Sequence, residues 1–220
     1  MVLCFVTDRR SLAATESGEP QKTLLSKIEA AAGAGVDWIQ IREKDLSGRD
    51  CGLLTREALQ RSAKSQAGNA ARTRIFVNDR LDIALTESAD GVHLGEKSLP
   101  LAEAKRLVVD RGERKDFVVG VSCHSLEAAR SAARDGADYL FFGPVFATPS
   151  KAAFGAPQGL ERLAEVCREV SIPVLAIGGI TMENASACLA AGASGIAAIR
   201  LFQDTGDISS VVQSLRNLAL

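Results

Sequence analysis

Four stretches of the chain, GAGVDWIQI (33–41), ESADGVHL (87–94), DGADYLFF (135–142) and AGASGIAAI (191–199), share one pattern. Each begins at the end of an expected helix, passes through a turn of small residues and continues into an apolar run. Glycine suits the left-handed turn that ends a helix. A short apolar run after such a turn is typical of a strand buried on both faces. The chain therefore repeats a helix–turn–strand unit.

Similar apolar runs are found along the whole chain, at residues 2–7, 38–41, 75–77, 91–94, 117–121, 139–142, 174–177 and 196–199. Segments expected as helices lie between or after them, at 22–34, 47–67, 81–86, 101–110, 126–135, 158–170, 182–191 and 208–218. Such an alternation fits a closed barrel or a doubly wound sheet, and repeated turns of one length favour a barrel. We expect an α/β fold, a single (βα)8 TIM barrel, with residues 1–220 as one domain.

The composition points to a soluble globular protein without a polyanionic partner. Hydrophobic residues make up 46% and charged residues 24% of the 220 residues. The chain has 26 basic and 27 acidic residues. This balance gives no electrostatic footprint for nucleic acid or an anionic membrane surface. No stretch approaches the roughly 18 apolar residues of a membrane span, and MVLCFVTDRR (1–10) lacks the features of a secretory signal. We expect a cytoplasmic protein, and the sequence leaves open a homo-oligomer.

Polar residues follow nearly every expected strand. A TIM barrel places its active site at the carboxyl ends of the strands, so these residues converge on one rim. The candidates are Gln40, Arg42 and Lys44 after the second strand, Asn78 and Asp79 after the third, Ser122 and His124 after the fifth, Thr148, Ser150 and Lys151 after the sixth, Gly179 after the seventh, and Ile199 and Arg200 after the eighth. Any one of these residues would be ordinary at the start of a loop, but the whole set predicts a ligand-binding site.

The chemistry of this rim suits a phosphorylated ligand. Arg42 and Lys44 alternate with Gln40, and together with Lys151 they would form a cationic pocket for a multiply charged oxyanion. The alternative is a surface ladder of ion pairs with the acidic residues interspersed among them. The Gly178–Gly179 pair lets backbone N–H groups approach an anion, and barrels often bind phosphate after the seventh and eighth strands.

Two further residues have two readings each. Asp79 beside Asn78 is a common environment for Mg²⁺, but Asp79 could instead cap the helix expected at 81–86, or do both. His124 could be a general acid or base, or a histidine at a helix start that is hydrogen-bonded to the backbone.

Six segments in order carry a family resemblance: IQIREKDLSGRD (39–50), FVNDRLDIAL (76–85), ADGVHLGEKSLP (89–100), VGVSCHSLEAA (119–129), GADYLFFGPVFATPSK (136–151) and PVLAIGGITMENA (173–185). They resemble the superfamily of thiamine phosphate synthases and TenI-type thiazole tautomerases, over residues 4–202. The synthases join hydroxymethylpyrimidine diphosphate to a thiazole phosphate, releasing pyrophosphate, and ionisation to a pyrimidine cation is thought to precede attack by the thiazole nitrogen.

The resemblance implies a role for each candidate. It places Gln40 at the pyrimidine, Arg42, Lys44, Asn78 and Lys151 at the diphosphate with Ser122 and Ser150 assisting, Asp79 at Mg²⁺, and Thr148, Gly179 and the backbone near Ile199 at the thiazole phosphate. Among these, Lys151 and Ser122 are expected to be catalytic, together with His124. The implied partners are therefore small phosphorylated pyrimidine and thiazole substrates, and the implied cofactor is Mg²⁺.

Two departures from the family pattern keep alternatives open. Ser98 stands where the synthases usually have a second acidic residue, with Glu96 as a nearby substitute, and Arg200 stands where a small serine is usual. Both favour the tautomerase branch, in which His124 would transfer protons without metal. The retained cationic set with Asp79 favours the synthase, which we take as the expected function. A phosphate-binding relative without catalysis is the third alternative.

Overall fold

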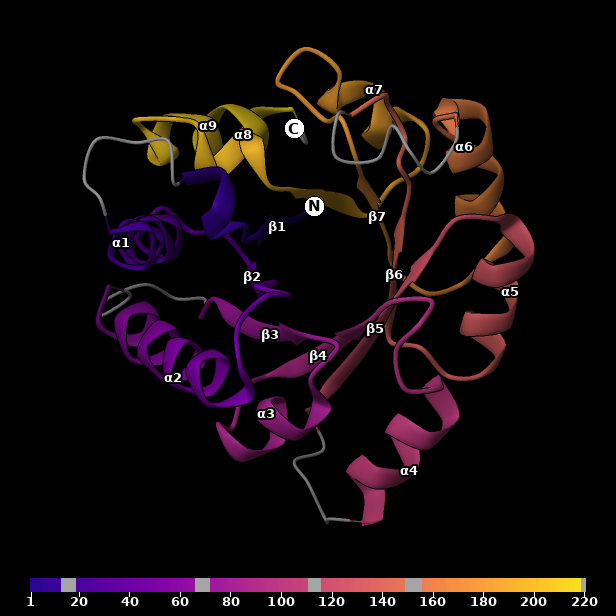
Figure 1. The fold of residues 1–220 in the computed structure, drawn as a ribbon. Coiled ribbons are helices and arrows are strands. Elements are labelled where there is room, and N and C mark those ends of the chain that lie inside the picture. Colours follow the sequence, from indigo (N-terminus) through magenta and orange to yellow (C-terminus); the bar gives the residue numbers. More distant parts are fainter. Residues whose placement is uncertain (13–18, 66–71, 111–115, 149–155, 219–220) are drawn as a thin grey trace.

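The computed structural model describes residues 1–12, 19–65, 72–110, 116–148 and 156–218, and its strands close into a parallel barrel in chain order (Figure 1). The strands are β1 (Val2–Val6), β2 (Trp38–Ile41), β3 (Arg74–Asn78), β4 (Gly91–Leu94), β5 (Val118–Cys123), β6 (Tyr139–Phe142), β7 (Val174–Ile177) and β8 (Gly195–Ala198). Pairing of β8 with β1 closes the ring. The (βα)8 fold expected from the sequence is confirmed.

Helices form a ring outside the strands (Figure 1). They are α1 (Pro20–Gly33), α2 (Gly48–Ser65), α3 (Leu81–Thr86), α4 (Leu101–Asp110), α5 (Leu126–Arg134), α6 (Gly159–Glu169), α7 (Ala185–Ala190), α8 (Arg200–Gln203) and α9 (Ile208–Asn217), with a 3₁₀ helix η1 (Arg9–Leu12) after β1. Within the described ranges, no helix is long and apolar enough to cross a membrane. The expected cytoplasmic location stays a prediction.

Three element boundaries differ from the sequence-based expectation. Strand β5 continues to Cys123, so Ser122 belongs to the strand rather than to the loop after it. Helix α1 begins at Pro20, whose fixed φ and missing N–H suit a first helical turn. Arg200 opens the four-residue helix α8, which is too short to produce a hydrophobic period in the sequence.

The repeated turn has a common backbone conformation. Gly35, Gly136 and Gly192 have φ angles of 85°, 89° and 98°, and Ser88 takes the equivalent place in the second repeat with φ 57°. Each ends the helix before an even-numbered strand, where a left-handed residue reverses the chain. The repeat therefore recurs at β2, β4, β6 and β8, and its period is two βα units.

An aspartate lies two residues after three of these turns and links consecutive strands. Asp37, Asp90 and Asp138 each accept a hydrogen bond through Oδ2 from a backbone N–H near the start of the preceding odd-numbered strand, at 2.6, 2.8 and 2.6 Å. Hydrogen bonds to a carboxylate are stronger than those between neutral groups. The units that contain β2, β4 and β6 are thus each tied to the strand before them.

Aromatic rings fill the interior of the barrel. The Tyr139 ring lies 4.7 Å from Trp38, 5.7 Å from Phe76 and 5.4 Å from Phe141, measured between ring centroids, and His93 lies 4.1 Å from Phe141. The barrel is therefore a packed core and not a pore. A ligand therefore has room only beyond this layer, at an end of the strands.

Gly120 makes room for the Tyr139 ring. A Cβ at Gly120 would lie 2.1 Å from Tyr139 Cζ, and the ring is confined by its aromatic neighbours. We expect Gly120→Ala to lower the free energy of unfolding by about 3 kcal/mol, at the upper end of typical overpacking costs. Gly206→Ala is the matched control, since a Cβ at that position would have no atom within 4 Å. Equal urea unfolding midpoints for the two variants would contradict this packing argument.

Candidate active site

A hydrogen-bonded chain crosses the rim from β2 to the loop after β3. Gln40 Nε2 donates to Asn78 Oδ1 at 2.8 Å, and Asn78 Nδ2 donates to Asp79 Oδ2 at 2.7 Å. Gln40 is buried at 2% exposure, while Asn78 and Asp79 are half-buried. Strands β2 and β3 pair with Gln40 opposite Phe76, which brings the ends of the two strands together.

The Asp79 carboxylate fixes the orientation of both amides. An ionised carboxylate only accepts hydrogen bonds, so the Asn78 NH₂ group must face it and the Asn78 oxygen must face Gln40. Gln40 therefore turns its NH₂ group to Asn78, and its Oε1 is left over. This buried oxygen has no hydrogen-bond partner among the described residues. The rim thus holds an open acceptor, meaning one without a hydrogen-bond partner, and a ligand that brings a donor would satisfy it.

Asp79 is held by its loop and does not cap helix α3. Its φ is 62°, a conformation that aspartate tolerates better than most residues. Oδ1 accepts from the Gly95 N–H at 3.2 Å and from the Ser98 hydroxyl, which in turn accepts from the Gly95 N–H at 2.7 Å. The N-cap of α3 is Arg80, without a side-chain capping bond. The capping alternative for Asp79 is therefore wrong.

The hydrogen bonds around the Asp79 carboxylate leave it able to bind Mg²⁺, as the single carboxylate of such a site. Three hydrogen bonds occupy three of the roughly four lone-pair positions of the carboxylate and leave one on Oδ2. Mg²⁺ commonly keeps several waters and binds through one or two carboxylates plus substrate phosphates. In the part of the chain that the structure describes, no three His, Cys, Asp or Glu side chains gather into a metal cage. Glu96 is exposed and makes no described bond to Asp79.

Arg42 and Lys44 are free cations, and the ion-pair ladder is wrong for the described residues. Strand β2 ends at Ile41, so Lys44 lies exposed in a turn and shares no strand face with Gln40. Glu43, which lies between them in the sequence, is engaged elsewhere: it is 7% exposed and accepts a hydrogen bond from the Thr7 hydroxyl at 2.6 Å. Burial raises the pKa of Glu43 despite this bond. No described side chain pairs with Arg42 or Lys44, so both charges remain available to an anion.

Ser122 and His124 lie at the end of β5 and just beyond it. Ser122 Oγ lies 2.8 Å from Nε2 of the buried His93. His124 Nδ1 contacts the Gly143 carbonyl oxygen. The sequence-based alternative, a helix-start histidine bonded to the backbone, is therefore correct for this nitrogen, and it leaves Nε2 without a partner among the described residues.

The glycine side of the rim is built by close approach of backbone segments. Gly179 has φ 68°, and a Cβ there would lie 2.6 Å from the Ala147 carbonyl oxygen, so the position requires glycine. Asn184 accepts from the Thr181 N–H at 2.9 Å and donates to the Gly179 carbonyl at 3.0 Å, which holds the turn. Thr148 lies on the neighbouring loop, and Ile199 precedes the exposed Arg200 at the start of α8. The predicted Ser150 and Lys151 lie outside the described residues.

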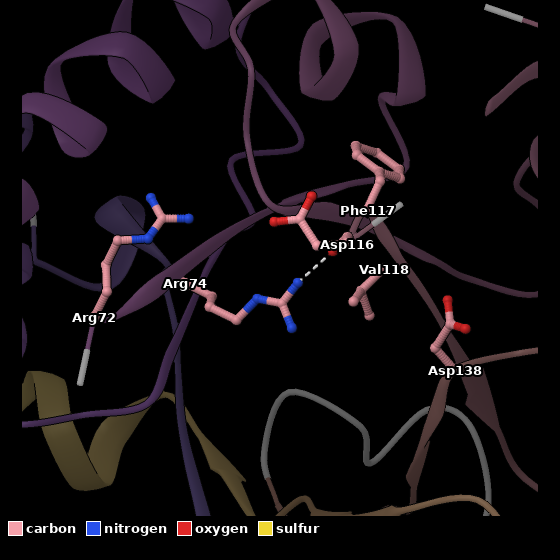
Figure 2. Close-up of a pocket in the computed structure, with 6 residues that line it drawn as sticks. All are labelled: Arg72, Arg74, Asp116, Phe117, Val118 and Asp138. Carbon is pink, nitrogen blue, oxygen red and sulfur yellow. Dashed lines mark hydrogen bonds between the residues drawn. The ribbon is translucent and has the colours of Figure 1, made fainter. Parts of the chain in front are cut away.

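A hollow of about 440 Å³ lies at the opposite end of the barrel (Figure 2). Its lining includes Arg74 and Val118, the first residues of β3 and β5. Its charges are engaged: Arg74 donates to the Asp116 carbonyl at 2.5 Å, and Asp138 pairs with Lys105 at 2.7 Å. A hollow at the amino ends of the strands, with paired charges, is a poorer ligand site than the carboxyl rim.

The barrel and its rim define a class: a TIM-barrel protein whose carboxyl-end site combines free cations, one carboxylate and a glycine turn, which suits phosphorylated small molecules. Comparison with known proteins gives the particular family. The chain belongs to the thiamine monophosphate synthase family, whose model matches residues 3–202. The resemblance seen in the six sequence segments is confirmed.

Individual relatives cover nearly the whole chain. The thiamine-phosphate synthase of Chloroflexus aurantiacus is 39% identical over 99% of this chain and 96% of its own length. That of Methanoculleus marisnigri is 44% identical over 89% and 86%. The solved structure of thiamine phosphate pyrophosphorylase from Pyrococcus furiosus matches with a TM-score of 0.81 and 32% identity, covering 99% of this chain and 94% of that one.

Sequence reasoning placed His93 at the rim without a role and did not single out Tyr139; His93 contacts Ser122, and Tyr139 contacts His93. His93 and Tyr139 are both 1% exposed and lie inside the barrel. The strand alternation could have indicated His93, because Gly91 and His93 share a face of β4 and Gly91 leaves no room for a side chain beside Phe76. Nothing local in DGADYLFF distinguishes Tyr139 from an ordinary core aromatic.

Proposed function

We propose that the chain is a thiamine-phosphate synthase, a transferase that joins hydroxymethylpyrimidine diphosphate to a thiazole phosphate and releases pyrophosphate. The bond between the pyrimidine methylene carbon and the diphosphate oxygen breaks, and a bond from that carbon to the thiazole nitrogen forms. Family membership supports this reaction. The observation that carries it is the hydrogen-bonded chain with the open Gln40 acceptor at one end and the Asp79 carboxylate at the other.

Gln40 would recognise the pyrimidine. Its Oε1 would accept a hydrogen bond from the amino group on the pyrimidine ring. A buried acceptor without a partner is unfavourable, and a ligand that supplies the donor removes this cost. Asn78 holds the Gln40 amide in that orientation through its own bond to Asp79. The Gln40 amide would thus be oriented for an aminopyrimidine before the ligand binds.

The free cations would hold the diphosphate and stabilise its departure. Negative charge grows on the diphosphate as the carbon–oxygen bond breaks, and fixed donors aimed at that charge lower the barrier. Arg42 supplies a planar guanidinium without a described partner, and Lys44 a second charge. Lys151 and Ser150 are proposed for this site on the family resemblance alone. Ser122 would donate a further hydrogen bond.

Asp79 would hold Mg²⁺ through its remaining Oδ2 position, with water and diphosphate oxygens completing the shell. Bound there, Mg²⁺ would neutralise charge on the departing pyrophosphate. Ser98 keeps the Asp79 carboxylate in place by its hydroxyl bond to Oδ1 and contributes no charge to the site.

The glycine side would hold the thiazole phosphate. The Gly179 turn brings backbone N–H groups close to an anion, and Thr148 and the backbone at Ile199 face the same end of the barrel. Barrels of this type bind phosphate after the seventh and eighth strands, often at a short extra helix, the place that α8 takes here. Arg200 would add a positive charge at the start of that helix.

The test is a two-substrate assay on the full chain. With both phosphorylated substrates and Mg²⁺, we expect pyrophosphate and thiamine phosphate in equal amounts, and neither when one substrate is left out. Absence of product at high enzyme concentration would reject the synthase. Ligand binding by calorimetry without turnover would then support the non-catalytic alternative.

One observation favours the tautomerase as a second candidate. A carbonyl oxygen only accepts, so the contact with Gly143 places the His124 proton on Nδ1 and leaves Nε2 as a base. This candidate predicts metal-free isomerisation of the thiazole carboxylate phosphate, lost in His124→Ala. A metal requirement in that assay would count against it.

A further inference from the structure

A hydrogen-bonded chain runs from the middle of the barrel to the rim through three neighbouring strands. The Tyr139 hydroxyl on β6 lies 3.0 Å from His93 Nδ1 on β4, and His93 Nε2 lies 2.8 Å from Ser122 Oγ on β5. Tyr139 and His93 are buried, while Ser122 is half-buried at the rim. The chain therefore connects a core phenol to a hydroxyl of the candidate site.

The His93 imidazole is neutral in this position. His93 is 1% exposed and packs against the Phe141 ring, and its only side-chain hydrogen-bond partners among the described residues are the Tyr139 and Ser122 hydroxyls, so no carboxylate is bonded to the ring to compensate a positive charge. A neutral imidazole has one N–H donor and one acceptor nitrogen, and the bond that one nitrogen makes decides the role of the other. Whichever role Nδ1 takes toward Tyr139, Nε2 takes the opposite role toward Ser122.

The surroundings of Tyr139 decide between the two tautomers. Its ring packs against Trp38, Phe76 and Phe141, and its hydroxyl has only His93 Nδ1 as a hydrogen-bond partner among the described residues. If Nδ1 carried the proton, the phenol would accept that bond and its own proton would face apolar side chains. A buried donor without an acceptor is disfavoured. Tyr139 therefore donates to Nδ1, and the proton of His93 lies on Nε2.

We propose that Tyr139 is a positioning residue which, acting through His93, commits the Ser122 hydroxyl to donate its hydrogen bond into the rim. Nε2–H donates to Ser122 Oγ, so the hydroxyl proton cannot point back at His93 and is directed to the ligand. This deepens the proposed function and rests on it, because the acceptor in the synthase reaction is the departing diphosphate. A donor held in this way is aligned before negative charge develops.

The tautomer can be measured without any assay of activity. The chain has two histidines, so a long-range ¹H–¹⁵N spectrum of the full protein, assigned by comparison with His124→Gln, reports the protonated nitrogen of His93. We expect a protonated Nε2 and an unprotonated Nδ1. Replacing Tyr139 by Phe removes only the phenol oxygen, and the spectrum should then show a mixture of both tautomers or the Nδ1–H form. A protonated Nδ1 in the native protein overturns the proposal.

A double-mutant cycle tests the consequence for catalysis. Tyr139→Phe should lower kcat about tenfold, because it weakens one donor to the leaving group without removing it, and should leave the KM for the diphosphate substrate nearly unchanged. In a Ser122→Ala background the same change should lower kcat by less than about twofold, since the donor that it orients is gone. A tenfold loss in both backgrounds would mean a packing effect and would overturn the proposal.

Trp38→Phe is the matched control, because Trp38 contacts the same ring and makes no hydrogen bond to His93. It should leave the His93 tautomer unchanged, and a tautomer shift in this variant would overturn the assignment to the Tyr139 hydroxyl. If native protein makes no thiamine phosphate, the proposed function fails while the spectrum still decides the tautomer. If Tyr139→Phe does not fold, the native spectrum alone decides it.

Discussion

Replacing Arg42 by Gln lowers kcat/KM for the synthase reaction by about 10²–10³-fold, the loss expected for one fixed donor to a developing negative charge. Arg42 directly follows Ile41, the last residue of β2, and is half-buried at the rim. It has no partner among the described side chains, so its removal breaks no internal ion pair. Stability should therefore change by no more than about 0.5 kcal/mol.

The comparison that isolates this effect uses two further variants. Arg42→Lys keeps the charge but loses the planar guanidinium, which can make two parallel hydrogen bonds, so it should retain only part of the native activity. Arg168→Gln removes an exposed arginine from the last turn of α6 and should leave kcat/KM unchanged. Steady-state kinetics and thermal unfolding of all three variants check the prediction. Equal activity of Arg42→Gln and Arg168→Gln would exclude Arg42 from the site.

Replacing Asp79 by Asn should remove Mg²⁺ activation and lower kcat/KM by about 10²–10³-fold. Asparagine tolerates the positive φ of this position, so the backbone conformation is kept. The variant has no charge to offer the metal, and its NH₂ group faces the donors of Asn78 or Gly95. The measurement is the rise of Tm with Mg²⁺ and pyrophosphate, which follows binding rather than turnover.

Ser98→Asp tests the same site in the opposite direction. A second carboxylate would lie beside Asp79, because the Ser98 hydroxyl already bonds to it. Without Mg²⁺ the two like charges should lower Tm, and with Mg²⁺ the gain in Tm should exceed that of the parent. The Mg²⁺ concentration for half-activation should fall about tenfold, equivalent to roughly 1.4 kcal/mol. An unchanged Mg²⁺ response in both variants would show that Asp79 does not hold the metal.

The location of the rim residues was predictable because it depends only on which residues follow each strand in the sequence. Once a strand was located, the residue after it was assigned to the carboxyl end, and this placed Gln40, Asn78, Asp79 and Ser122 correctly at one end of the barrel. Sequence spacing was less reliable for Lys44, because its alternation with Gln40 places both on one face only in a strand that continues past Ile41, and the chain turns there instead. The roles of these residues stay proposals that the assays above test.

The sequence by itself determined the fold: the repeated turn, the buried apolar runs and the polar residues that follow them are set by backbone preference and burial within a few neighbouring residues. Only the tertiary structure decided how the polar groups are paired. The open Gln40 acceptor depends on a carboxylate 39 positions later in the chain, and the Tyr139–His93 bond joins residues 46 apart. Such pairings follow from the register of a closed barrel, which no local pattern contains, because each hydrogen-bond role is fixed by the partner that the register brings into contact.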